Sequence, residues 1–249
     1  MDGVLYRGDQ ALPGAADFVS WLRGKGIAFS LVTNNATLTP AQYVARLDGI
    51  GIAAREDEIF TSALATALYL KERAGAGATA YAIGEEGLRA ALELVDIKLS
   101  GDRPDWVIVG LDRHVTYEKL ATAALAIQRG AQFIGTNPDT SLPTERGLAP
   151  GAGAIQAALS ATTGVKPTVV GKPEPLMLEL ALKQMNAAAE TAALLGDRLD
   201  TDIQGAHAVG LPSILVLTGV STRQEATTGP IRPTLIVDDL PSLMREWGK

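Results

Sequence analysis

Short apolar, β-branched runs alternate along the chain with longer segments in which apolar residues recur at helical spacing. Buried strands are expected at 27–32, 59–61, 79–83, 106–109, 132–134, 168–170, 192–195 and 213–217. Helices are expected between them, at 41–47, 63–73, 85–94, 117–129, 150–161, 175–185 and 203–209. Strands that alternate with helices predict parallel sheets covered on both faces, so the pattern indicates an α/β fold.

Two stretches of small, turn-forming residues divide this pattern, at 74–78 (Ala-Gly-Ala-Gly-Ala) and at 163–167. The alternation of strands and helices starts again after each stretch. We therefore expect one α/β domain, residues 74–167, to be inserted into another that is formed by residues 1–73 and 168–249.

The composition narrows the function classes. The 249 residues carry a net charge of -6, which disfavours general attraction to nucleic acid or to an anionic membrane. Cysteine is absent, which excludes thiolate nucleophiles and cysteine-ligated zinc. No apolar run approaches the length of about 18 residues that a membrane span needs, and the start lacks a signal-like apolar region. A cytoplasmic protein without a membrane or nucleic-acid partner is expected.

Polar groups directly after strands are the candidates for chemistry, because ligands of open parallel sheets sit at the carboxyl ends of the strands. Four such groups stand out: Asp2-Gly3, Thr33-Asn34-Asn35, Gly171-Lys172-Pro173, and the segment 196–202 (Gly-Asp-Arg-Leu-Asp-Thr-Asp).

The segment 196–202 holds three carboxylates, those of Asp197, Asp200 and Asp202, directly after an apolar strand. Carboxylates this close repel one another, and hard oxygen ligands favour Mg²⁺ over zinc or copper. We expect Asp197, at the strand tip, to bind the metal. Two roles are open for Asp202: it belongs to the metal site, or it caps the next helix and supports the site.

The other polar groups are weaker signals when each is taken alone. Lys172 precedes a proline-started helix and could neutralise a phosphoryl group, but an exposed loop lysine is commonly just solvated. Thr33 and Asn34 offer a hydroxyl and an amide to phosphate oxygens, and they also suit a turn before a helix.

The order of the four groups is more specific than any one of them. Asp-Gly-Val-Leu, Leu-Val-Thr-Asn-Asn, Gly-Lys-Pro and Gly-Asp-Arg-Leu-Asp-Thr-Asp resemble, in sequence and spacing, the motifs of the haloacid-dehalogenase (HAD) superfamily. The segment between the second and third motifs resembles the inserted cap of the NagD-like, p-nitrophenyl-phosphatase branch (subfamily IIA), as do 136–139 and 218–220. The resemblance implies a doubly wound parallel sheet core with an inserted α/β cap.

The resemblance also assigns roles to individual residues. Asp2 would be the general acid/base, with its backbone carbonyl touching Mg²⁺. Asp197 would bind the metal, and Asp202 would belong to the metal site by orienting metal-bound water. The implied phosphate- and substrate-binding residues are Thr33, Asn34, Asn35, Lys172, Asn137 and Asp139. Asn-Pro-Asp at 137–139 is also ordinary turn chemistry. His114 and Tyr117 are expected on the surface of the cap or in its packing, and not in a catalytic role.

The chain departs from the family pattern at its start. The family's first motif is a strand followed by Asp-x-Asp-Gly, whose first aspartate is the nucleophile. Asp2 matches the second aspartate and Met1 matches x, so the nucleophile would occupy the position before Met1. Either the natural chain is longer and supplies it, or the protein is a non-catalytic relative.

Three hypotheses follow. The leading one is a Mg²⁺-dependent phosphomonoester hydrolase that acts on a small phosphorylated metabolite through an aspartyl phosphate. The alternative is a catalytically inactive relative that binds Mg²⁺ or a phosphorylated metabolite. The third is a structural or interaction protein whose acidic segment is a solvated loop. The sequence names no physiological substrate, and a homodimer is compatible with the resemblance.

Overall fold

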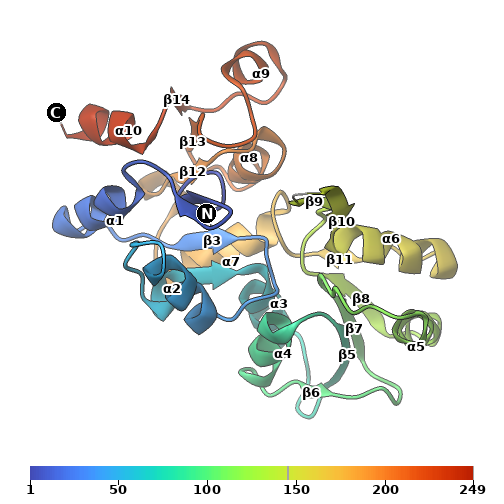
Figure 1. Ribbon diagram of the computed structural model, residues 1–249. Helices are drawn as coiled ribbons and strands as arrows, with labels where there is room; N and C mark the ends of the chain where they lie inside the picture. The colour runs from blue at the N-terminus through green and yellow to red at the C-terminus, as the bar shows by residue number, and fades with distance from the viewer. Residues whose placement is uncertain (145, 249) are drawn as a thin grey trace. The chain divides into compact units, whose positions relative to one another are not determined.

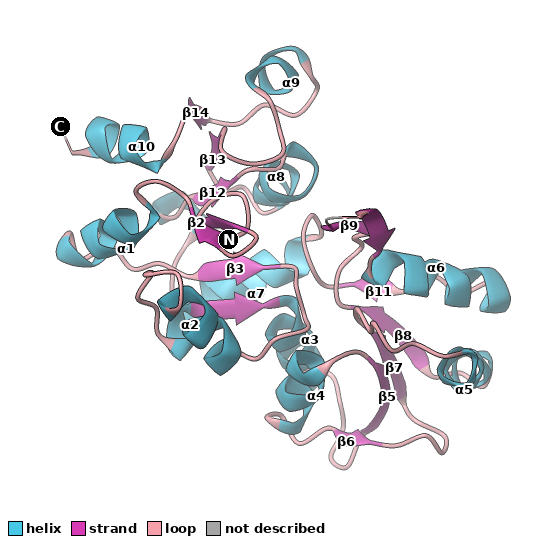
Figure 2. Ribbon diagram, in the orientation of Figure 1, coloured by secondary structure: helices cyan, strands magenta, loops and turns pink. Residues whose placement is uncertain are grey.

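The structure is a computed structural model that describes residues 1–144 and 146–248. It divides into two compact units. The first unit comprises Met1–Val32, Pro40–Phe60 and Lys172–Lys249, and the second comprises Thr33–Thr39 and Thr61–Gly171. Strands alternate with helices in both, which confirms the predicted α/β class (Figures 1 and 2).

The strands of the first unit form separate small sheets among the described residues. Its strands are β1 (Tyr6–Arg7), β2 (Gln10–Ala11), β3 (Leu31–Thr33), β4 (Ile59–Thr61), β12 (Leu194–Gly196), β13 (Ser213–Val216) and β14 (Leu235–Val237). β1 and β2 are an antiparallel hairpin, β3 pairs with β4, and β12, β13 and β14 are parallel with β13 in the middle. Every residue of β13 is buried, whereas β3 is half-buried along its length.

Helices and short turns surround these strands. The helices are α1 (Ala15–Gly24), α2 (Pro40–Asp48), α7 (Pro175–Met185), α8 (Gln204–Ala208), α9 (Arg223–Thr228) and α10 (Leu240–Trp247). Shorter turns are η1 (Glu56–Glu58), η2 (Ala189–Thr191) and η3 (Leu199–Ile203), the last a π-helical turn. α1 packs against α10, where the rings of Trp21 and Trp247 stack with centroids 6.2 Å apart. Leu178 of α7 packs with Ala206 of α8 in a buried apolar cluster.

The second unit is built on a parallel sheet with strand order β11-β8-β7-β5-β6. These strands are β5 (Thr79–Ile83), β6 (Lys98–Leu99), β7 (Trp106–Val109), β8 (Gln132–Gly135) and β11 (Thr168–Val169). β9 (Ser141–Thr144) and β10 (Gly147–Pro150) form an antiparallel hairpin. β7 is buried along its whole length because it lies inside the sheet and under helices on both faces.

The helices of the second unit cover both faces of this sheet. They are α3 (Ser62–Lys71), α4 (Glu86–Glu93), α5 (Tyr117–Gln128) and α6 (Ala152–Thr163). α3 and α4 lie together on one face, and α5 and α6 lie together on the other (Figure 1). Val107, Ile127, Phe133 and Leu159 share the apolar core beneath α5 and α6.

Most expected elements are present, with differences at their ends. The observed bounds of α7, β4, β5 and β7 are those expected from the sequence. The strand expected at 27–32 is shorter, because its partner β4 begins at Ile59 and ladder pairing starts only at Leu31. The helix α1 and the hairpin of β9 and β10 were not predicted. No helix in the described part of the chain is long and apolar enough to span a membrane.

Candidate active site

Asp197 lies at the point where β12 ends, so the strand carries it to the sheet's carboxyl edge. Its side chain is buried, and Oδ2 accepts a hydrogen bond of 3.0 Å from the backbone N–H of Val220. Its backbone carbonyl accepts a bond of 3.0 Å from the N–H of Ser221. Within the described residues no side-chain cation forms an ion pair with Asp197. The carboxylate is therefore held rigidly, and no protein side chain neutralises its charge.

Glycines allow two backbone segments to approach this carboxylate. A Cβ atom at Gly3, whose φ is +73°, would collide with Oδ2 of Asp197, and so would one at Gly219. The hydroxyl of Thr218 donates a bond of 2.7 Å to the carbonyl of Gly3 and ties the two segments together. The backbone segment that contains Asp2, the residue before Gly3, is thus brought close to Asp197 in space.

Asp202 is buried and engaged on both oxygens. Oδ1 accepts a bond of 2.6 Å from Nζ of Lys172, which is itself buried. Oδ2 accepts bonds of 3.2 Å from the backbone N–H groups of Asp197 and Arg198. Burial alone would raise the pKa of the Asp202 carboxyl, but the ammonium of Lys172 holds that pKa below its ordinary value. Asp202 therefore braces the loop and orients Lys172.

The other two acidic residues of the motifs, Asp2 and Asp200, lie on the surface. The exposed carboxylate of Asp2 accepts a bond of 3.0 Å from the N–H of Gly3. Its neighbour Tyr6 is buried, which raises the pKa of the Tyr6 hydroxyl to about 12. Asp200 is exposed and forms an ion pair of 2.7 Å with Arg198. Asp2 is therefore open to solvent, whereas the carboxylate of Asp200 is paired with a neighbouring arginine.

The donor set around Asp197 fits a hard divalent cation. Burial and then the charge of Asp202 raise the pKa of the Asp197 carboxyl, although the N-terminal ammonium and then the Val220 amide oppose this. A buried carboxylate in that position is stabilised by a bound cation, and its oxygens suit Mg²⁺. Among the described residues, no three side chains from histidine, cysteine, aspartate and glutamate form a metal cage. A magnesium ion at Asp197 would therefore draw on backbone carbonyl oxygen, such as that of Asp2, and on water.

The Thr33-Asn34-Asn35 loop belongs to the second unit and is folded by its own side chains. Thr33 Oγ1 accepts a bond of 3.2 Å from the N–H of Asn35. Asn35 Oδ1 accepts bonds of 2.8 Å from both the N–H and the hydroxyl of Thr37. These Asx-type contacts fix the loop between β3 and α2. The turn that the sequence suggested at Thr33 and Asn34 is therefore present. Binding of phosphate by these residues stays a prediction.

Asn137 and Asp139 contact this loop from more than a hundred residues away. Asn137 Nδ2 donates a bond of 2.7 Å to the carbonyl of Asn34, and Asn34 Nδ2 donates one of 3.4 Å to Asp139. Asn137 Oδ1 accepts a bond of 3.1 Å from the N–H of Asp139. Gln156 supports the turn from α6, since its Nε2 donates a bond of 2.9 Å to the carbonyl of Asn137. Asn34, Asn137 and Asp139 thus form one polar network.

The predicted site residues fall into two groups. Asp2, Lys172, Asp197 and Asp202 belong to the first unit, and Thr33, Asn34, Asn35, Asn137 and Asp139 belong to the second.

Residues that the sequence did not point to also shape these groups. Val220 and Ser221 hold Asp197 through backbone amides, and Gln156 holds the Asn137 turn through a side-chain amide. A backbone N–H is present in every residue type except proline, so the identity of Val220 did not indicate that it would bind Asp197. The resemblance at 218–220 did mark that loop as a family feature, although without a reason for it.

Family models match both ends of the chain. A model described as haloacid dehalogenase-like hydrolase matches residues 1–98, and a second, HAD-hydrolase-like model matches residues 169–243. The acid sugar phosphatase of Staphylococcus saprophyticus is 43% identical, and the alignment covers 100% of this chain and 96% of that protein.

Solved structures resemble the whole chain as well. NagD from Escherichia coli K-12 is 37% identical with a TM-score of 0.90, and the match covers 96% of this chain and 94% of NagD. The glycerol phosphate phosphatase of Mycobacterium tuberculosis, solved in complex with magnesium, is 40% identical with a TM-score of 0.91. That match covers 98% of this chain and 74% of the mycobacterial chain. The similarity therefore extends through both units.

Proposed function

Because this chain belongs to the haloacid-dehalogenase superfamily, and within it to the NagD-like branch (subfamily IIA), we propose that it is a Mg²⁺-dependent phosphatase of small phosphorylated metabolites. Hydrolysis of phosphomonoesters is the activity for which its relatives are named, and the chain is a phosphatase of this family. One observation carries the metal dependence. Asp197 is a buried carboxylate at a strand end, with a raised pKa and no side-chain cation paired to it in the described chain.

The proposed reaction has two displacements at phosphorus. An aspartate oxygen attacks phosphorus, the bond from phosphorus to the ester oxygen breaks, and Asp2 donates a proton to that leaving oxygen. Asp2 then takes a proton from the water that attacks the aspartyl phosphate, which releases inorganic phosphate and restores the aspartate. Lys172, held in place by Asp202, neutralises charge on the phosphoryl oxygens. Bound Mg²⁺ supplies Lewis-acid stabilisation of that charge.

We place the attacking aspartate at the position directly before Met1, where the family motif has it. The sheets of the first unit support this proposal. In the described chain, β3 and β12 each pair along one edge only. Leu31, Val32, Leu194 and Leu195 in these strands are half-buried, whereas the paired strand β13 is fully buried. A preceding strand that pairs with these edges would cover them and deliver the nucleophile.

Residues 74–167 are proposed to act as the inserted cap that selects the substrate and excludes water. Asn137 and Asp139 would contact the substrate, and Thr33, Asn34 and Asn35 would hold its phosphoryl group. The relatives named as acid sugar phosphatase and glycerol phosphate phosphatase favour phosphorylated sugars and polyols as the substrate class.

The test is hydrolysis of p-nitrophenyl phosphate with and without Mg²⁺, by the chain as written and by a version extended upstream through the aspartate. Turnover by the extended version alone supports both the phosphatase and the placement of the nucleophile. Equal turnover by both versions would mean that a different group attacks phosphorus.

If neither version hydrolyses p-nitrophenyl phosphate with Mg²⁺ present, the alternative is favoured, a relative that binds Mg²⁺ or a phosphorylated metabolite without turnover. That alternative predicts a rise in melting temperature when Mg²⁺ and inorganic phosphate are added together. The same titration on the Asp197→Asn variant is the control, because it removes the charge that would hold the metal.

We also propose a cytoplasmic homodimer. The acidic composition and the absence of cysteine suit the cytoplasm, and the dimer rests on the family resemblance. Cell fractionation and analytical ultracentrifugation test the two statements separately. Recovery in a membrane fraction would contradict the first, and a monomer at micromolar concentration would contradict the second.

A further inference from the structure

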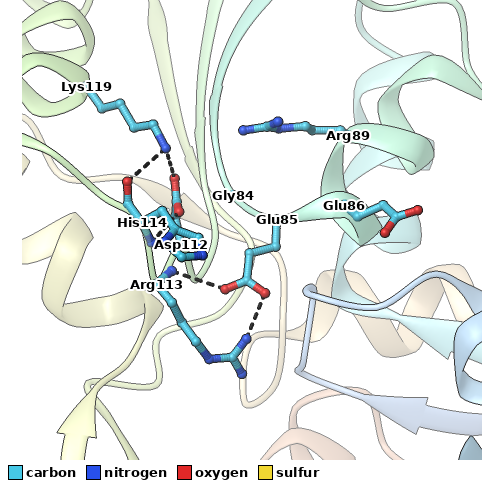
Figure 3. Close-up of a pocket in the computed structure, with 8 residues that line it drawn as sticks. All are labelled: Gly84, Glu85, Glu86, Arg89, Asp112, Arg113, His114 and Lys119. Carbon is cyan, nitrogen blue, oxygen red and sulfur yellow. Dashed lines mark hydrogen bonds and ion pairs between the residues drawn. The ribbon is translucent and has the colours of Figure 1, made fainter.

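The second unit contains a cleft that the proposed reaction does not use. Its volume is about 290 Å³, and it is open to solvent (Figure 3). It is lined by Gly84, Glu85, Glu86, Arg89, Asp112, Arg113, His114 and Lys119. These residues come from two segments of the chain, the turn from β5 with the start of α4, and the turn from β7 with the start of α5.

The cleft lies where the topology of the sheet reverses. From β5 the chain passes through α4 to β6 on one side, whereas from β7 it passes through α5 to β8 on the other side. β5 and β7 are parallel neighbours, and they end in register at Ile83 and Val109. The carboxyl ends of two such strands splay apart at a switch point, which is where open α/β sheets bind ligands.

Most charges in the cleft are already neutralised in pairs. Arg113 forms an ion pair of 2.7 Å with Glu85, and Lys119 forms one of 2.7 Å with the buried Asp112. Arg89 is the exception, because its guanidinium forms no ion pair with any residue that the structure describes. Figure 3 shows the Arg89 side chain extending from α4 toward Lys119.

The acidic residues do not cancel the charge of Arg89. Figure 3 shows Glu86 pointing away from the other lining side chains. Glu85 is the N-cap of α4, yet its side chain does not cap the helix, since both of its oxygens bind Arg113. The open cleft therefore presents one exposed arginine, Arg89, that has no ion-pair partner among the described residues, beside two cations that are held by carboxylates.

We infer that this cleft binds a small anion that bears a phosphate or a carboxylate group, with Arg89 as its principal contact. The planar guanidinium suits bidentate recognition of either group. Arg113 is a second contact, which becomes available when it exchanges Glu85 for the ligand. The site is independent of the proposed hydrolysis and of Mg²⁺, because it uses none of the residues assigned to that reaction.

The test is NMR titration of the full-length, ¹⁵N-labelled chain with inorganic phosphate in the absence of Mg²⁺, followed by a second titration with acetate. Saturable shifts of the backbone amides at 84–89 and 112–119 are expected with at least one of these anions. Shifts with phosphate alone identify a phosphate site, and shifts with both identify a general carboxylate or phosphate site. Shifts confined to 171–172 and 196–202 would overturn the inference while leaving the proposed function intact.

Two substitutions make the assignment residue-specific. Arg89→Gln is expected to weaken anion binding at least tenfold, whereas Arg129→Gln is expected to leave it unchanged. Arg129 is the matched control, since it is an exposed arginine of the same unit that does not line the cleft.

Glu85→Gln is expected to tighten binding about fivefold, because it removes a competing carboxylate and releases Arg113. A cleft whose ion pairs are purely structural would show no gain from Glu85→Gln. That result, or equal effects of the two arginine substitutions, would contradict the inference.

Discussion

The two units organise their strands in opposite ways. In the second unit, β11, β8, β7, β5 and β6 form one continuous parallel sheet, and its inner strand β7 is completely buried. In the first unit, the described strands fall into separate sheets, and β3 and β12 keep half-buried apolar residues.

Charge is also distributed differently. The first unit buries Lys172, Asp197 and Asp202 close together at a strand end. The second unit buries Asp112 against Lys119, and most of its other charges lie at the surface. Buried charge lowers the stability of a fold unless it is paired or binds a ligand. From this contrast we expect the buried charges to make the first unit less stable in the absence of a ligand than the second unit, which is built on one continuous sheet.

The largest expected effect is on turnover, from Asp197→Asn in whichever form of the chain is active. Loss of this buried carboxylate should reduce Mg²⁺-dependent hydrolysis of p-nitrophenyl phosphate by roughly 10²-fold or more. Thermal melts without metal should show a fold at least as stable as the parent, because a buried charge has been removed. Asp200→Asn, in the same loop but exposed, should change the rate by less than about twofold. An equal loss of turnover in Asp197→Asn and Asp200→Asn would contradict the proposed metal-binding role of Asp197.

The next largest effect is on stability, from Lys172→Met. This change leaves the Asp202 carboxylate buried without its cation, so unfolding in urea should show a loss of roughly 3–5 kcal/mol. The double variant Lys172→Met/Asp202→Asn should recover a large part of that loss, because no charge then remains unpaired. If the two single losses simply add in the double variant, the pair does not act as a unit.

A smaller effect should follow Gln156→Leu in the second unit. Its amide donates hydrogen bonds of 3.1 Å to the carbonyl of Val109 and 2.9 Å to that of Asn137. The loss should be about 1–3 kcal/mol in urea unfolding, with a rise in KM if Asn137 contacts the substrate. Gln132→Leu is the matched control, since Gln132 is exposed on β8 and should be near neutral. A change in kcat with no change in KM would contradict a role in positioning substrate.

The smallest effect concerns pH. Asp105 accepts bonds of 2.8 Å and 3.0 Å from the N–H and the hydroxyl of Thr79, and these bonds lower its pKa from the ordinary 3.8. A lowered pKa contributes stability above pH 3.8 that is lost as the pH falls through the native value. Asp105→Asn should therefore cost about 0.5–1 kcal/mol at pH 7, since the group is exposed, and nothing at low pH.

The control for that measurement is Asp102→Asn, whose exposed side chain makes none of these contacts and which should not change the free energy of unfolding at either pH. A loss from Asp105→Asn that persists in acid would indicate a packing effect in place of the hydrogen bonds.

Local structure was largely predictable from the sequence. The bounds of α7 and β7 follow from apolar spacing, from a proline at the first turn of α7 and from β-branched residues in β7. The hairpin of β9 and β10 could not be foreseen, because its strands are short and mostly exposed and lack the alternation that marks a half-buried strand. The same limit applies to the β1 and β2 hairpin.

The candidate site was predictable in its chemistry and not in its contacts. Carboxylates after a strand indicated a metal site, and the order of four motifs indicated the superfamily, which the comparisons confirm. The sequence left two roles open for Asp202, and its oxygens are occupied by Lys172 and by two backbone amides. The individual roles of the site residues stay predictions that the variants above can decide.

The sequence by itself therefore determined the α/β class, the order of most of the longer elements and the residue types available for chemistry, because periodicity and turn residues act through neighbours along the chain. Only the tertiary structure decided the strand order, the pairing of Lys172 with Asp202 and the contact of Asn137 with Asn34. It also decided that Arg89 and Lys119 line the same cleft. Contacts between residues 30 or 103 positions apart depend on how whole elements pack, and packing is set by all the apolar surface that the fold buries together.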